Sequence, residues 1–190
     1  RGERQQLLVE WNDTRSEFPR ETSIPQLFER QVERVPDAVA VVFEAAADRG
    51  PGERLSYREL NRRANQLAHH LRSLGVGPEV LTGIYLERSA RTVVGILGIL
   101  KAGGAYLPLD LSYPMERLSF MLEDAGAPVL ITDAGLAATL PATLAERGVK
   151  VVCVDRDAPG IARRSDRNPD RVAAVGAENL AYAIYTSGST

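Results

Sequence analysis

The spacing of apolar residues along the chain alternates between short continuous runs and the three-to-four-residue rhythm of a helix. The runs predict strands at 39–43, 80–86, 129–132, 151–154 and 181–185, with a shorter extended piece at 106–107 that Pro108 ends. The helical rhythm predicts amphipathic helices at 23–35, 56–74, 89–101, 114–125 and 136–147. This alternation predicts an α/β fold, in which helices flank both faces of a largely parallel sheet.

The helix predicted at 56–74 has the clearest pattern. Ser56 and Glu59 match a capping box, in which the hydroxyl and the carboxylate each satisfy a backbone N–H at the helix start. Gly75 stands where the helix would end. One apolar stripe runs between these signals, formed by Leu60, Ala64, Leu67, Leu71 and Leu74.

The opposite side of this helix is polar. Arg58, Arg62 and His69 lie there, so we expect them to face solvent. We expect no metal or acid–base role for His69 and His70, because adjacent helical positions do not face each other. Residues 1–22, ahead of the first helix, are polar and irregular in pattern, which predicts an arm lying on a surface, with Trp11 and Phe18 as isolated anchors.

Composition limits the classes of function. The 190-residue chain carries a net charge of −2 at pH 7, which predicts no nucleic-acid partner and no binding to an anionic membrane. Its longest apolar run, 93–100, is far shorter than the roughly 20 residues that span a bilayer, and no signal sequence opens the chain. Cys153, the only cysteine, is expected to be a small buried hydrophobe in a cytoplasmic protein. Because the chain begins at Arg1 rather than at Met, we expect an excised part of a longer protein.

The candidate site lies at the end of the chain, where the strand predicted at 181–185 runs into hydroxyl groups around a glycine. These residues are Thr186, Ser187, Gly188, Ser189 and Thr190. Glycine allows successive backbone N–H groups to turn inward and form an anion-binding nest, and the hydroxyls add donors. The carboxyl ends of parallel strands are also where α/β proteins bind ligands. The residues alone leave two interpretations open, a polyphosphate site and an ordinary polar turn.

Other catalytic motifs are missing from the sequence. It contains no Walker motif, no Gly-x-Gly-x-x-Gly after a strand and no Gly-x-Ser-x-Gly elbow. The acidic pair Glu123 and Asp124 is expected on an exposed helix face rather than in an acid–base dyad.

Four segments, in order and spread over the chain, together resemble the adenylation domain of nonribosomal peptide synthetases. This branch belongs to the adenylate-forming enzymes, whose phosphate-loop motif is similar to 186–190. Residues 55–60 resemble the first core motif of the branch, and residues 100–110 resemble the second almost letter for letter. Residues 8–32, with Trp11-Asn12-Asp13-Thr14, resemble the linker and first helix that follow a condensation domain.

The resemblance implies that 1–22 is a linker from a preceding condensation domain and that 23–190 is the N-terminal part of an adenylation domain. The loop at 186–190 would hold the β and γ phosphates of ATP, with Mg²⁺, while the carboxylate of an amino acid attacks the α phosphorus. The aminoacyl group would then pass to the phosphopantetheine thiol of a carrier domain. We expect no catalytic residue and no metal ligand within 1–190, and we do not assign the family's catalytic lysine to Lys101.

In the family, the phosphate loop continues beyond the position of Thr190. We therefore expect the 190-residue chain by itself to be inactive. Two alternatives stay open: a related enzyme that activates a fatty or aryl acid, and a binding module that docks a condensation domain or a small MbtH-like protein. The motifs at 55–60 and 100–110 are expected to be scaffold rather than ligand contacts.

Overall fold

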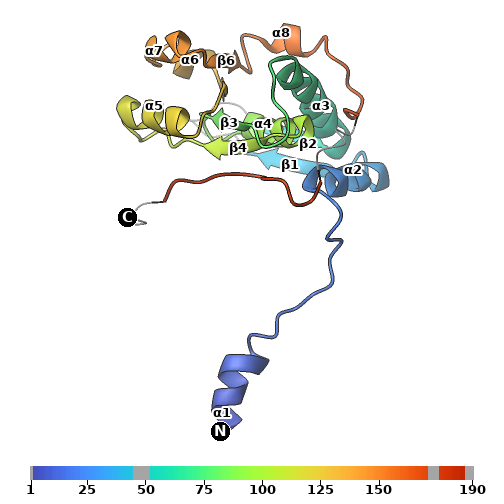
Figure 1. Ribbon diagram of the computed structural model, residues 1–190. Helices are drawn as coiled ribbons and strands as arrows, with labels where there is room; N and C mark the ends of the chain where they lie inside the picture. Colours follow the sequence, from blue (N-terminus) through green and yellow to red (C-terminus); the bar gives the residue numbers. More distant parts are fainter. Residues whose placement is uncertain (1, 45–51, 171–175, 187–190) are drawn as a thin grey trace.

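The computed structural model describes residues 2–44, 52–170 and 176–186, and a four-stranded parallel sheet lies at the centre of the fold (Figure 1). The sheet consists of β3 (Leu81–Ile84), β4 (Ala105–Pro108), β5 (Val129–Thr132) and β6 (Lys150–Cys153), in the order β4-β3-β5-β6. Thr82 on β3 pairs with Tyr106 on β4 and with Val129 on β5. The predicted α/β class with a parallel sheet is confirmed, and the strand expected at 80–86 is shorter at both ends.

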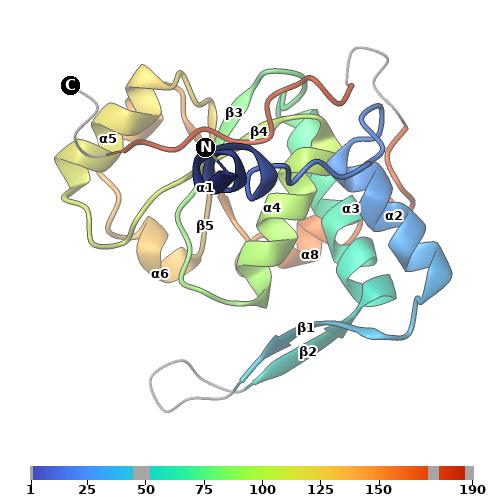
Figure 2. The same ribbon diagram turned by 90° about the horizontal axis from the view of Figure 1, so that it is seen from below.

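Helices cover both faces of this sheet. One face packs against α3 (Tyr57–Ser73), α4 (Ala90–Ala102) and α8 (Ala158–Ile161), and the other against α5 (Met115–Asp124) and α7 (Thr143–Glu146) (Figure 2). Neighbouring residues of one strand supply both cores, because successive side chains point to opposite faces. On β5, Ile131 joins the core under α3 and α4, whereas Leu130 joins the core under α5.

A separate two-stranded hairpin lies beside the helices. It pairs β1 (Val39–Phe43) antiparallel with β2 (Glu53–Ser56). The helix α2 (Ile24–Arg34) precedes it and begins at Ser23, whose backbone N–H donates to the Gln26 side chain at 3.0 Å. These bounds confirm the helix predicted from Ser23 to Pro36. None of the helices in the described ranges is long and apolar enough to cross a membrane.

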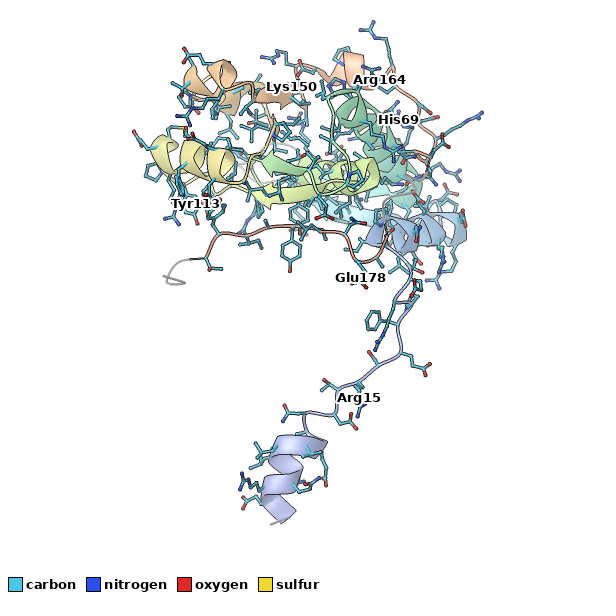
Figure 3. All side chains as sticks on the ribbon, in the orientation of Figure 1. Arg15, His69, Tyr113, Lys150, Arg164 and Glu178 are labelled. Atoms are coloured by element: carbon cyan, nitrogen blue, oxygen red, sulfur yellow. The ribbon has the colours of Figure 1, made fainter. Side chains whose placement is uncertain are left out.

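The arm differs from its prediction. Residues 2–10 are helical, as α1 (Gly2–Gln5) and the π-helix η1 (Gln6–Glu10), where we expected irregular chain. Residues 2–20 are all exposed, and the arm extends away from the body rather than lying on it, with Arg15 far from the sheet (Figure 3). Glu, Arg, Gln and Leu favour helix locally, and this propensity acts without any packing partner. That 1–22 is a linker from another domain stays a prediction.

The prediction of one continuous helix at 136–147 is also wrong. It is divided into α6 (Ala134–Ala137) and α7, with Pro141 between them. Proline lacks a backbone N–H, and its ring clashes with the preceding turn, so one continuous helix cannot form across this position. Asp133 caps α6 instead, where its carboxylate accepts the Leu136 N–H at 2.9 Å.

The start of α3 is held by one half of the predicted capping box. The Ser56 hydroxyl accepts the Glu59 N–H at 3.2 Å, but the Glu59 carboxylate pairs with Arg62 and Arg63 instead of the Ser56 backbone. These arginines lower the pKa of Glu59 to about 2, the bond from Arg62 having the largest effect. The reciprocal bond was therefore a wrong prediction, because two guanidinium groups one turn away compete better than one backbone N–H.

We expect Ser56→Ala to destabilise α3 by about 1 kcal/mol, the usual value of a lost N-cap bond. Ser89 is the matched control, because it stands at the N-cap of α4 without a side-chain cap bond. Hydrogen exchange of the first turn of each helix in the complete domain measures the effect. We expect faster exchange in the first turn of α3 in Ser56→Ala and no change in the first turn of α4 in Ser89→Ala. If the two substitutions changed exchange equally, the role of the Ser56 hydroxyl would be contradicted.

We had expected the polar side of α3 to face solvent, but part of it is buried. Asn65 and Gln66 are buried there under the segment 162–170. The Asn65 side chain donates to the Asp166 carbonyl at 2.7 Å, and the Gln66 side chain donates to the Ala162 carbonyl at 2.8 Å. His69 lies 3.1 Å from the Arg167 carbonyl and is partly buried, which corrects its predicted solvent-facing position. Side-chain amides can bond a passing backbone, so a polar helix face can also be a packing face.

Candidate functional site

The last described segment, 176–186, runs alongside β4 at the edge of the sheet (Figure 2). Tyr182 forms a parallel bridge with Tyr106, and their rings lie 5.5 Å apart. The Tyr106 N–H donates to the Ala181 carbonyl, and the Ala183 N–H donates to the Tyr106 carbonyl, each at 3.0 Å. The strand predicted at 181–185 is therefore reduced to one bridge in an extended segment, although its position beside a parallel strand is as expected.

Because this segment is parallel to β4, its carboxyl end reaches the same edge of the sheet as the carboxyl ends of β3 and β4. Thr186 is exposed at that edge. The other four residues of the predicted phosphate loop, Ser187, Gly188, Ser189 and Thr190, lie outside the described residues. The structure thus shows where the loop begins, and the role of the five residues stays a prediction.

A cleft of about 410 Å³ lies beside this point. Its walls come from the residues that follow β3 and β4 and from the end of the last segment, among them Leu86, Arg88, Leu109, Asp110, Ile184 and Tyr185. Tyr113 also lines the cleft and lies near α5 (Figure 3). The cleft therefore occupies the position at which open α/β sheets bind ligands.

Charged groups of both signs border the cleft. Arg88 follows β3, and the guanidinium of Arg117 lies 4.2 Å from the centre of the Tyr113 ring. The Asp110 carboxylate accepts the Ser112 N–H at 2.8 Å, and this bond holds the pKa of Asp110 below its ordinary value. Neither arginine was among the predicted site residues. The signal that could have found Arg88 is its place just after a buried strand.

Tyr185 connects the last segment to α5. Its hydroxyl donates to the Asp124 carboxylate and lies 3.5 Å from the Met121 carbonyl. Burial, followed by the contact with Asp124, raises the pKa of Tyr185 to about 12, so its hydroxyl stays protonated as a donor. Glu123 and Asp124 are exposed, as predicted, but Asp124 also has this specific partner.

The two glycines of the motif at 100–110 have structural roles, whereas Leu109 and Asp110 of the same motif line the cleft, so its role as scaffold stays a prediction. Gly103 ends α4 with a φ of 98°, a left-handed conformation that suits glycine. A Cβ on Gly104 would lie 2.7 Å from the Val76 side chain and 3.0 Å from the Val80 carbonyl oxygen, so a larger residue does not fit. Both glycines therefore set the turn that leads into β4.

Lys101 has a structural partner and does not reach the candidate site. Its ammonium group is buried, forms an ion pair with Glu29 on α2 and lies 3.3 Å from Asn168 Oδ1. Cys153 is also buried, and burial raises the pKa of its thiol, which fits the predicted inert role. Across the described residues, no group of three or more His, Cys, Asp or Glu side chains could hold a metal ion.

Comparisons with known proteins agree with this geometry. The family model described as AMP-binding enzyme matches residues 28–190. Tyrocidine synthase 3 of Brevibacillus parabrevis is 49% identical over 189 residues, which is 100% of this chain and 3% of that protein. The AMPPNP-bound form of FmoA3, a nonribosomal peptide synthetase, has a TM-score of 0.80 and 35% identity over 96% of this chain and 18% of that one.

The Klebsiella oxytoca NpsA N-terminal subdomain, solved with 3-hydroxybenzoyl-AMSN, shares the fold with a TM-score of 0.72 at 24% identity. It matches 93% of this chain and 41% of that one. A parallel sheet has a cleft at its carboxyl edge, and the family model matches most of the chain, so the chain belongs to the AMP-binding enzymes. Within that family it is an N-terminal portion of an adenylation domain of the nonribosomal peptide synthetase type. The chain spans only a few per cent of the length of the curated synthetases that it matches.

Proposed function

We propose that the protein to which this chain belongs activates an amino acid with ATP. The carboxylate of the amino acid attacks the α phosphorus, an aminoacyl adenylate forms and pyrophosphate leaves. The observation that carries the proposal is the parallel course of 181–186 beside β4, because it brings Thr186, the first residue of the predicted loop, to the carboxyl edge of the sheet. Polyphosphate binding at such an edge follows from inward-facing N–H groups and hydroxyl donors.

The contribution of this loop would be to hold the pyrophosphate leaving group and to stabilise the charge that develops on it. Fixed donors do this without reorganisation during the reaction. Arg88, at the rim of the adjacent cleft, could add a positive charge near the phosphates. Mg²⁺ on the phosphates would neutralise part of their charge, and we expect its carboxylate ligand outside 1–190.

The later steps and the partners are proposed on the same basis. The aminoacyl group would pass to the phosphopantetheine thiol of a carrier domain, and a condensation domain would precede the arm. The curated relatives that contain this stretch are far longer than it, which supports a multidomain arrangement. The one cysteine of the chain is free and buried, and this fits the predicted cytoplasmic location.

A second candidate function is docking, because the arm exposes large apolar side chains. Leu8 is 60% exposed, and Trp11 and Phe18 are each 65% exposed. Such residues on a projecting arm could bind a condensation domain or a small MbtH-like protein. Co-purification of each partner with the complete domain, with and without residues 1–22, distinguishes docking from a purely catalytic role.

The test of the proposed function is amino-acid-dependent exchange of pyrophosphate into ATP. We expect exchange by the complete adenylation domain and none by residues 1–190 alone. The chain matches only 41% of the NpsA N-terminal subdomain chain, so much of the surface around the loop would come from other residues. Exchange by the 190-residue piece, or a complete domain that ignores ATP, would contradict the proposal.

A further inference from the structure

Few backbone bonds hold the segment that leads into the phosphate loop. Between 179 and 186, the bonds to β4 are the two at Tyr106 described above. The start of the segment is held by a side chain, since the Glu79 carboxylate accepts from the Asn179 amide at 2.6 Å and from the Leu180 N–H at 3.3 Å. Glu79 has a φ of 60°, a left-handed conformation that costs energy for a residue other than glycine. Its position must therefore be fixed by its surroundings.

The other end of the segment is held by the bond between Tyr185 and Asp124. Side chains alternate here, with Tyr182 and Ile184 exposed and Ala183 and Tyr185 partly buried against α5. Asp124 is the last residue of α5, a helix anchored by the buried residues Leu118, Met121 and Leu122. A bond to this helix end therefore fixes Tyr185 against a rigid element, one residue before Thr186.

We propose that Asp124 is a positioning residue for the phosphate site, acting through the Tyr185 hydroxyl to fix the position of Thr186, the residue at which the predicted loop begins. The inference rests on the proposed function, because it concerns the site for the ATP phosphates. The negative charge of Asp124 does not favour a nearby polyphosphate, so its contribution comes from the hydrogen bond and not from attraction.

The charge of Asp124 also makes it possible to distinguish a positioning role from a contribution to the stability of α5. A carboxylate in the last turn of a helix interacts unfavourably with the helix dipole, so Asp124→Ala should not weaken α5. Glu123 is the matched control, because it is a neighbouring acid in the same turn that pairs with Arg147 and not with Tyr185. A loss of activity in Asp124→Ala but not in Glu123→Ala therefore cannot come from the helix charge.

The experiment measures pyrophosphate exchange and direct ATP titration in the complete domain. Asp124→Ala and Tyr185→Phe should each raise KM and Kd for ATP about ten-fold, as for one lost hydrogen bond to a charged group, and leave KM for the amino acid unchanged. The double variant should be no worse than either single variant, because both remove the same bond. Asp124→Asn should stay near the wild type, since its amide oxygen still accepts from the tyrosine.

Several results would overturn the inference. These are Asp124→Ala behaving like Glu123→Ala, additive effects in the double variant, or Asp124→Asn being as impaired as Asp124→Ala. If the wild-type domain binds ATP but shows no amino-acid-dependent exchange, the proposed function fails, and the titrations still decide on Asp124. A wild-type domain that does not bind ATP would contradict both the proposed function and the role of Asp124.

Discussion

Replacing Thr190 by valine in the complete domain is expected to lower kcat/KM for pyrophosphate exchange by about 100-fold. Valine has nearly the shape of threonine, so the change removes a hydroxyl donor and little else. A fixed donor aimed at developing negative charge contributes a factor of about 10²–10³ to the rate. If the loop grips the leaving pyrophosphate, the lost donor should lower the rate of the chemical step as well as ATP binding.

Thr14→Val provides the control for this substitution. Thr14 lies in the exposed arm, and the arm projects away from the sheet (Figure 1). Its replacement changes the same atoms in the same residue type, so exchange activity should stay at the wild-type level. Equal activity of the two variants would show that the terminal hydroxyls do not serve the phosphates, and the loop would then be an ordinary polar turn.

Replacing Glu29 by alanine is expected to destabilise the fold by about 3 kcal/mol, the largest stability effect that we predict. The Lys101 side chain is 1% exposed, and Glu29, its ion-pair partner, is 22% exposed. Removing one partner leaves an uncompensated charge in the interior, which is far more costly than the pair is stabilising. Asn168 and the Phe28 ring would remain as the nearest groups to the ammonium.

Urea unfolding of the complete domain measures this effect, with Glu33→Ala as the control. Glu33 lies on the same helix and is exposed, so its loss should change the stability little. The double variant Glu29→Leu with Lys101→Met should recover most of the loss, because it removes both charges. A Glu29→Ala variant as stable as Glu33→Ala would show that water reaches the Lys101 ammonium.

The stability of the Glu29→Ala variant should also depend on pH, and the direction follows from the pKa of Lys101. Burial holds the pKa of Lys101 below its ordinary value of 10.5, and the bond to Glu29 opposes that shift. Without Glu29 the pKa of the folded state should fall further. The unfolded state then binds more protons than the folded state between that lowered pKa and 10.5, so stability rises with pH in this window. The penalty of Glu29→Ala should therefore shrink as the pH is raised from 7 toward 10.

Local patterns were enough to predict most of the elements. The stripe on α3 is confirmed, with Leu60, Ala64, Leu67 and Leu71 buried. A helix repeats every 3.6 residues and a strand every two, so the order of apolar positions reports the element and its buried face. The parallel sheet followed from the alternation of such elements, and the candidate loop followed from hydroxyls and a glycine placed after a strand.

The errors have two kinds of cause. Some are local, because the Glu59 carboxylate pairs with Arg62 and Arg63 on its own helix and Pro141 interrupts the helix predicted at 136–147. Others arise because polar side chains take partners from distant parts of the chain, as Asn65 and His69 do with a segment about 100 residues away. The same holds for Lys101 with Glu29 and for Tyr185 with Asp124. Hydrophobic periodicity arises from the geometry of one element and can be read along the chain, whereas these contacts exist only after the sheet has brought separate segments together. The residues of 1–190 therefore define the α/β class and a candidate phosphate loop, and the packing of the sheet and helices selects the groups that hold the segment leading into this loop.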